Sequence, residues 1–186
     1  RAIAAFGYLI IYQLLFVYTG YGEWTMARSI DGGPLGPLSW VSILLFGTLL
    51  YDYLKERESR DFIRISLIWG VLLTVLGYLL SLLQPQEVWQ FSQRSMSMAY
   101  PILSSGIGFL TFLLFYMVND LYKKELPHLT ILGINPLLLY IVQNILIDLH
   151  GDVLPANAPL WQAISGFVII YTLCYLVAHY LWRTKM

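Results

Sequence analysis

The sequence predicts an all-α fold, a multi-pass transmembrane helix bundle with six spans and both termini in the cytoplasm. Composition, long apolar stretches and the placement of basic residues predict it. Of the 186 residues, 58% are hydrophobic and only 12% are charged, and the mean hydropathy is +0.66. Soluble domains are about 45–50% apolar and about 25% charged. A water-soluble domain, a disordered chain and a nucleic-acid binder are therefore excluded, and the single cysteine, Cys174, excludes a secreted disulfide scaffold.

Six stretches are long and apolar enough to cross a bilayer, since a spanning helix needs about 20 mostly apolar residues. Tryptophans near the ends of several stretches fit the preference of indole for the membrane interface. The predicted spans are Ala2–Tyr18, Leu35–Leu54, Ile65–Leu83, Met96–Val118, Leu129–Ile147 and Leu160–Trp182.

Basic residues alternate between the two sides of these spans, nine on the first side and two on the second. Lys and Arg in short loops stay cytoplasmic. Both termini are therefore expected in the cytoplasm, with Thr19–Pro34, Gln84–Ser95 and Asp148–Pro159 as outer loops. The first side holds Arg1, Lys55, Arg57, Arg60, Arg64, Lys123, Lys124, Arg183 and Lys185, and the second holds Arg28 and Arg94.

The chain is expected to form a single transmembrane domain, residues 1–186, of an integral membrane protein. An apolar span begins directly after Arg1, so we expect further spans upstream. The expected partners are the lipid bilayer, those missing N-terminal spans and a second copy in a homo-oligomer. The middle of the predicted spans holds no Asp, Glu, Lys or Arg, which weighs against a proton pump or ion-coupled transporter.

Proline interrupts two predicted spans, at Pro101 and Pro136. Proline removes a backbone donor and displaces the carbonyl four residues earlier, which is that of Leu132 for Pro136. Two alternatives follow: Asn135 satisfies that carbonyl, or the helix is broken and Asn135 lines a cavity. Asn144, in the same span, is a second candidate for substrate binding, although interhelical hydrogen bonding is the ordinary role of such a group.

Small residues recur in the fourth predicted span, over Ser104–Gly108. Small residues at four-residue spacing allow helix backbones to approach closely. We expect this segment to pack against another helix.

The predicted outer loops carry the remaining candidates. Asp31 lies in a Gly- and Pro-rich turn, and Ser92 and Arg94 precede the fourth span. Arg94 is a candidate to bind a carboxylate or phosphate, or a surface arginine paired with Asp31. His150 beside Asp148 is a candidate general base, or a solvated loop histidine. Asp-x-His-x-Asp is a weak metal pattern, and no metal site is predicted.

The cytoplasmic loops suggest a docking surface for an anionic co-substrate. Lys55, Arg57, Lys123 and Lys124 are candidates to attract the phosphates of coenzyme A. The alternative is that these residues only set the orientation in the membrane.

The stretch Gly133-Ile134-Asn135-Pro136-Leu137-Leu138-Leu139-Tyr140 and the short basic tail after the last span resemble the C-terminal end of the heparan-α-glucosaminide N-acetyltransferase family. The family pattern Gly-x-Asn-x-x-Leu-x-Tyr is matched by Gly133, Asn135, Leu138 and Tyr140. The resemblance implies about eleven spans, of which these are the last six, and a catalytic histidine upstream of Arg1.

The resemblance also implies transfer of an acyl or acetyl group from cytoplasmic acetyl-CoA, or another acyl-CoA, to a sugar or glycan acceptor on the outer side, in the bacterial inner membrane. Acyl-CoA would be a co-substrate and not a resident cofactor. The alternatives are one half of a transporter or flippase, and a structural membrane subunit without chemistry.

Overall fold

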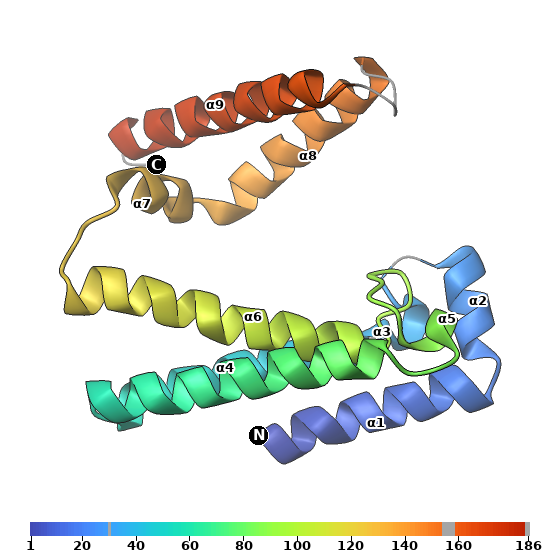
Figure 1. The fold of residues 1–186 in the computed structure, drawn as a ribbon. Helices are drawn as coiled ribbons and strands as arrows, with labels where there is room; N and C mark the ends of the chain where they lie inside the picture. The colour runs from blue at the N-terminus through green and yellow to red at the C-terminus, as the bar shows by residue number, and fades with distance from the viewer. Residues whose placement is uncertain (30, 154–158, 185–186) are drawn as a thin grey trace. The chain divides into compact units, whose positions relative to one another are not determined.

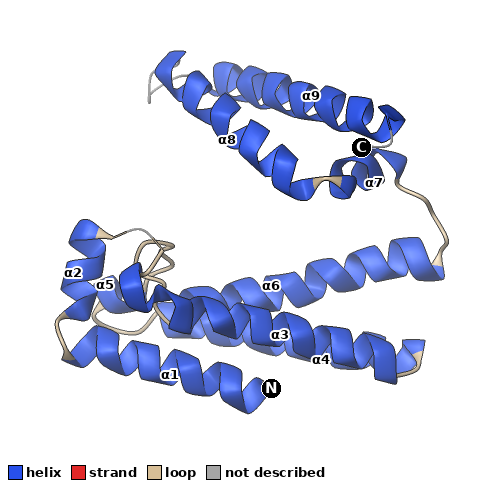
Figure 2. Ribbon diagram, turned by 180° about the vertical axis from the view of Figure 1, so that it is seen from behind, coloured by secondary structure: helices blue, strands red, loops and turns tan. Residues whose placement is uncertain are grey.

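The computed structural model describes residues 1–29, 31–153 and 159–184, with the backbone alone described for residues 86 and 150–153. Every regular element of these residues is helical (Figures 1 and 2). The chain divides into two compact units, Arg1–Tyr122 and Lys123–Met186, and each is described by itself.

Unit 1 is built from four long helices and several short ones. Loops at the same end of α1, α3 and α6 carry the short elements α2, η1 and α5 (Figure 1). The elements are α1 (Ala2–Tyr18), α2 (Tyr21–Arg28), η1 (Gly33–Leu35), α3 (Gly36–Glu56), α4 (Ser59–Ser81), α5 (Gln86–Trp89), α6 (Ala99–Tyr116) and the π-helical turn η2 (Met117–Leu121).

The core of unit 1 lies where α3, α4 and α6 meet and where α1 packs on α3. Its centre holds large apolar side chains, among them Phe46, Phe62, Leu73 and Phe109.

Glycines set the distance between α4 and α6. A Cβ atom on Gly77 would lie 2.6 Å from the backbone nitrogen of Leu103, and one on Gly106 would lie 2.9 Å from the carbonyl oxygen of Gly70. The expected packing of the small residues is thus confirmed at Gly106. Gly108 has open space around it.

Unit 2 contains α7 (Pro127–Ile134), α8 (Pro136–Val153) and α9 (Leu160–Thr184). Helix α9 packs against both others. The buried residues that hold the three helices together are Ile131, Leu139, Cys174 and Ala178. This core is small, and most apolar side chains of α8 and α9 are exposed.

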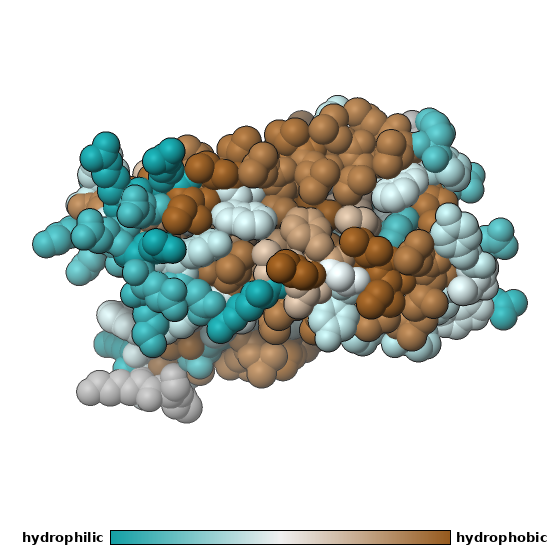
Figure 3. All heavy atoms as spheres, turned by 90° about the horizontal axis from the view of Figure 1, so that it is seen from below, coloured by the Kyte–Doolittle hydropathy of each residue, from teal (hydrophilic) through white to brown (hydrophobic). Residues whose placement is uncertain are grey.

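The regular elements of the described residues are all helical and provide four to six candidate membrane spans. Six is reached only if two bent pairs of helices each cross the membrane as one span. These pairs are α1 with α2 and α7 with α8, and each is bent by 89°. Hydrophobic side chains cover most of the face seen in Figure 3, with hydrophilic ones gathered at its two ends. The four unbroken candidates are Gly33–Glu56, Ser59–Ser81, Ala99–Leu121 and Leu160–Thr184.

Several predicted boundaries were wrong. The predicted loop Thr19–Pro34 contains α2, and the loop Gln84–Ser95 contains α5. The fourth predicted span starts at Ala99, so Pro101 lies in the first helical turn, where its missing N–H is tolerated. The predicted loop from Asp148 is helical as far as Val153.

Candidate functional site

The break between α7 and α8 follows from Pro136. The residue before a proline is disfavoured in the helical region, and Asn135 has φ −127° and ψ 64°. Pro136 then starts α8, where its fixed φ suits the first helical position. The amide of Leu139 donates to the carbonyl of Asn135 at 3.1 Å, which begins the new helix. The break that the second sequence-based alternative requires is thus present.

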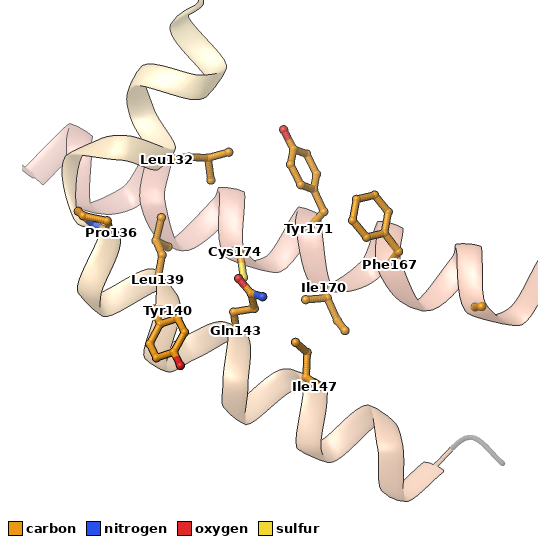
Figure 4. Close-up of a pocket in the computed structure, with 11 residues that line it drawn as sticks. Leu132, Pro136, Leu139, Tyr140, Gln143, Ile147, Phe167, Ile170, Tyr171 and Cys174 are labelled. Atoms are coloured by element: carbon orange, nitrogen blue, oxygen red, sulfur yellow. The ribbon is translucent and has the colours of Figure 1, made fainter. Parts of the chain in front are cut away.

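A pocket of about 720 Å³ lies beside this break, between α8 and α9 (Figure 4). Its wall residues recur at three- and four-residue steps on each helix, the spacing of one helix face. The volume falls within the range of about 300–1,000 Å³ typical of small-molecule sites. The lining residues are Leu132, Pro136, Leu139, Tyr140, Gln143, Ile147, Ala163, Phe167, Ile170, Tyr171 and Cys174.

The pocket wall is largely aliphatic and aromatic. Its polar groups are the amide of Gln143 and the hydroxyls of Tyr140 and Tyr171. Figure 4 shows the amide of Gln143 extending from α8 toward Cys174 on α9. No charged side chain is among the lining residues, so the wall suits an apolar ligand with few hydrogen-bonding groups.

A histidine–tyrosine pair joins α7 to α9. The Nδ1 atom of His128 lies 3.0 Å from the hydroxyl oxygen of Tyr175, and the tautomer of the imidazole decides which group donates. The Tyr175 ring also stacks with the ring of His179, with a distance of 6.0 Å between the ring centroids. Nδ1 of His179 is buried with no hydrogen-bond partner among the described residues. His128 was not a candidate from the sequence, because its partner lies 47 residues away.

The predicted site residues of unit 2 lie along α8 and just before α7. Asn135 stands at the break and is half-buried, and the residues that line the pocket do not include it. Asn144 is half-buried beside Gln143. Lys123 and Lys124 are exposed in the segment that leads into α7.

The predicted pairing of His150 with Asp148 placed both residues in an outer loop. Both residues belong to α8, and positions two apart on a helix do not share a face. Helical geometry therefore does not favour this pair. Asp148 is exposed, and the His150 side chain lies outside the described part of the structure.

In unit 1 the candidates Asp31, Ser92 and Arg94 come together where two loops meet, the one before α3 and the one between α5 and α6. We call these two loops the cap. The carboxylate of Asp31 accepts a hydrogen bond from the Gln93 side-chain amide at 2.7 Å, so the suggested ion pair with Arg94 is replaced by this contact. Arg94 is exposed, and its carbonyl accepts the amide of Gly32 at 2.9 Å. The hydroxyl and carbonyl of Ser92 bond within its own loop.

Buried polar side chains fasten this cap to the helices. The Tyr12 hydroxyl donates to the carbonyl of Ser95 at 2.6 Å, and the Ser39 hydroxyl donates to the carbonyl of Met96 at 2.7 Å. The amide of Met98 donates to the side-chain oxygen of Gln13 at 2.9 Å. These contacts satisfy the backbone of a loop, so the cap has a structural role.

The other basic candidates, Lys55 and Arg57, lie exposed where α3 ends and α4 begins. Glu56 and Glu58 alternate with them in the sequence and offset their charge. The described residues contain no group of three or more His, Cys, Asp or Glu placed to hold a metal ion.

Comparison with protein-family models, with curated proteins and with solved structures found no match to this chain. The residues that line the pocket are visible in the sequence as apolar residues at helical spacing on two consecutive long helices. Sequence reasoning missed it because apolar stripes are common in membrane helices and their facing partners are not readable from one sequence.

Proposed function

We propose that this chain is the membrane-embedded part of an acyltransferase. It moves an acyl group from cytoplasmic acyl-CoA to a sugar acceptor on the outer side of the membrane. The general base is expected on the spans upstream of Arg1 that the family resemblance implies. This chain supplies a cavity for a reactant and hydrogen-bonding groups beside it.

The observation that supports this proposal is the pocket beside the broken helix. Non-helical backbone at membrane depth is tolerated where it is buried in protein or lines a cavity, and this break lies beside a pocket. Acyl transfer requires donors toward the oxygen on which negative charge develops. At the α7 end of this pocket, Nδ1 of His128 lies 3.0 Å from the hydroxyl oxygen of Tyr175, and these two groups supply such donors.

The test uses membranes that contain this chain together with any spans encoded upstream of Arg1. They receive radiolabelled acetyl-CoA and a panel of amino sugars and glycans. We expect label to enter a glycan. Tyr175→Phe should lower kcat/KM about tenfold or more, because it removes one of these donors. Tyr180→Phe, exposed on the same helix, is the matched control and should retain activity. No transfer to any acceptor, together with no binding of CoA, contradicts the proposal.

Transport is a second candidate, and the broken helix is the observation that favours it. Substrate sites of secondary transporters are often formed by discontinuous helices. The described spans place no charged residue in the pocket wall, so a transported substrate would be apolar or neutral. Exchange of a labelled substrate across proteoliposomes without acyl-CoA would favour transport over acyl transfer.

A further inference from the structure

We propose that the pocket of unit 2 holds the hydrocarbon chain of a long-chain acyl-CoA, with His128 and Tyr175 binding the polar end of that chain. The inference rests on the proposed acyl transfer for the identity of the donor. It names a donor class, a long-chain acyl thioester, that differs from acetyl-CoA.

The shape of the pocket fits an extended chain. Its wall runs from Pro136 to Ile147 on α8 and from Ala163 to Cys174 on α9. Each run covers eleven steps of 1.5 Å, or about 16 Å along the helix. The hydrocarbon layer of one leaflet is about 15 Å thick, half of the roughly 30 Å core. The pocket is therefore about as long as the extended hydrocarbon chain of a membrane lipid.

The chemistry of the wall fits the same ligand. A sugar needs many hydrogen-bonding partners, and this wall offers one amide and two phenols. An acetyl group would leave most of the roughly 720 Å³ empty. A long hydrocarbon chain fills the volume and packs against the exposed side chain of Phe167 and the half-buried side chain of Ile170.

Polar groups stand just beyond the α7 end of the pocket. His128 precedes the lining residue Leu132 by four positions, and Tyr175 follows the lining residue Tyr171 by four. Four residues are about one helical turn, so each member of the pair continues its wall by one turn. His128 is exposed while bonded to Tyr175 at 3.0 Å, so a thioester carbonyl at this end would meet an imidazole and a phenol.

The charges of unit 2 suit a CoA group at the same end. Arg183 lies one turn beyond His179 on α9, and Lys123 and Lys124 precede α7, with Glu125 as the acidic residue among them. Asp148, on α8 beyond Ile147, lies toward the opposite end of the pocket. Cationic groups near the pair complement the phosphates of CoA.

The experiment is photo-cross-linking in membranes that contain the full chain. The probe is palmitoyl-CoA with a diazirine at mid-chain, and labelled peptides are located by mass spectrometry. We expect label on α8 and α9 within Pro136–Ile147 and Ala163–Cys174. Excess palmitoyl-CoA should compete for this labelling at a far lower concentration than acetyl-CoA, which carries the same CoA group but lacks the hydrocarbon chain.

Two pairs of variants test the pocket and its polar end. Ala163→Trp fills the pocket and should reduce labelling about tenfold, while Ile169→Trp, exposed on the other side of α9, should leave it unchanged. Tyr175→Phe should weaken competition by palmitoyl-CoA about three- to tenfold through loss of a hydrogen-bonding group. Tyr180→Phe, exposed on the same helix, should have no effect.

Three outcomes overturn the inference: label spread over all exposed helices, equal competition by palmitate and palmitoyl-CoA, or label only from a phosphatidylcholine that carries the same diazirine chain. A fourth outcome also overturns it: if cross-linking the protein into a dimer shields these residues from the probe, a second copy of the chain and not an acyl chain occupies the pocket. These results are separable from the proposed function. Acetyl transfer without chain binding contradicts the inference alone, and chain binding without any transfer contradicts the acyltransferase alone.

Discussion

At the scale of single residues, Tyr12 is the clearest link between a span and the loops of unit 1. Its side chain is fully buried, and its hydroxyl donates to the carbonyl of Ser95. A second carbonyl, that of Gly32, lies 3.4 Å from the same hydroxyl. Gly32 has φ +80°, a conformation that favours glycine, which allows the loop to turn at this contact.

Tyr12→Phe should destabilise the protein. The substitution keeps the ring but removes the donor, and a buried carbonyl left without its partner costs about 1–3 kcal/mol. The unfolding midpoint in mixed SDS and dodecyl maltoside micelles measures this change. Tyr8→Phe, exposed on the same helix, is the control and should leave the midpoint unchanged. Equal midpoints for both variants would show that the hydroxyl does not hold the cap.

At the scale of secondary-structure elements, close helix contacts and one break decide the arrangement. Helices α4 and α6 approach through Gly70, Gly77 and Gly106. In lipid, apolar burial does not drive helix association as it does in water, so such close packing carries much of the stability.

Gly106→Leu should destabilise unit 1 by about 1–3 kcal/mol, because the new side chain would collide with the backbone of Thr74 on α4. Gly108→Leu is a matched control on the same helix, since a Cβ atom at that position would meet no atom of another helix within 4 Å. Unfolding midpoints in mixed micelles compare the two variants. A loss of stability for Gly108→Leu as large as that for Gly106→Leu would contradict the packing explanation.

Pro136→Ala tests the cause of the break. A continuous helix would place Leu129 and Ile145 about 24 Å apart along its axis, whereas an 89° bend at Asn135 gives about 17 Å. We expect the distance between spin labels at these two exposed positions to lengthen in the variant, measured by double electron–electron resonance. An unchanged distance would mean that packing of α7 and α8 on α9, and not the proline, holds the bend.

At the scale of the whole molecule, the distribution of basic residues predicts orientation. The turn between α3 and α4 is expected in the cytoplasm, and the loop that holds α5 is expected outside. The helices themselves carry no such information, because an apolar helix fits the bilayer in either direction.

Single cysteines test this orientation in a Cys174→Ala background. Glu58→Cys should resist a membrane-impermeant maleimide in intact cells, and Glu87→Cys should react. Both positions are exposed, so reactivity reports the side of the membrane and not burial. Lysed cells, in which both should react, are the control. Labelling of Glu58→Cys from outside would reverse the topology and remove the cytoplasmic acyl-CoA site.

The helical class and most long helices were predictable, because about 20 apolar residues in a row have few other stable structures than a membrane helix. The predicted stretch Ala2–Tyr18 coincides with α1. Short helices such as α2 were not predictable, since Tyr21–Arg28 has little apolar character and its Tyr21 hydroxyl bonds to Gly32 and Leu35 in the loop that follows. At Asn135 the sequence left two alternatives, because proline both bends and breaks helices.

Local composition thus determined by itself that this protein is helical and apolar enough for a membrane, and where its backbone is weakest, at Pro136. Only the tertiary structure decided which side chains meet. The bond between His128 and Tyr175, the pocket between α8 and α9 and the cap around Tyr12 all join residues far apart in sequence. Such contacts depend on which helix faces turn toward each other, and apolar faces that all suit lipid carry no pairing information of their own.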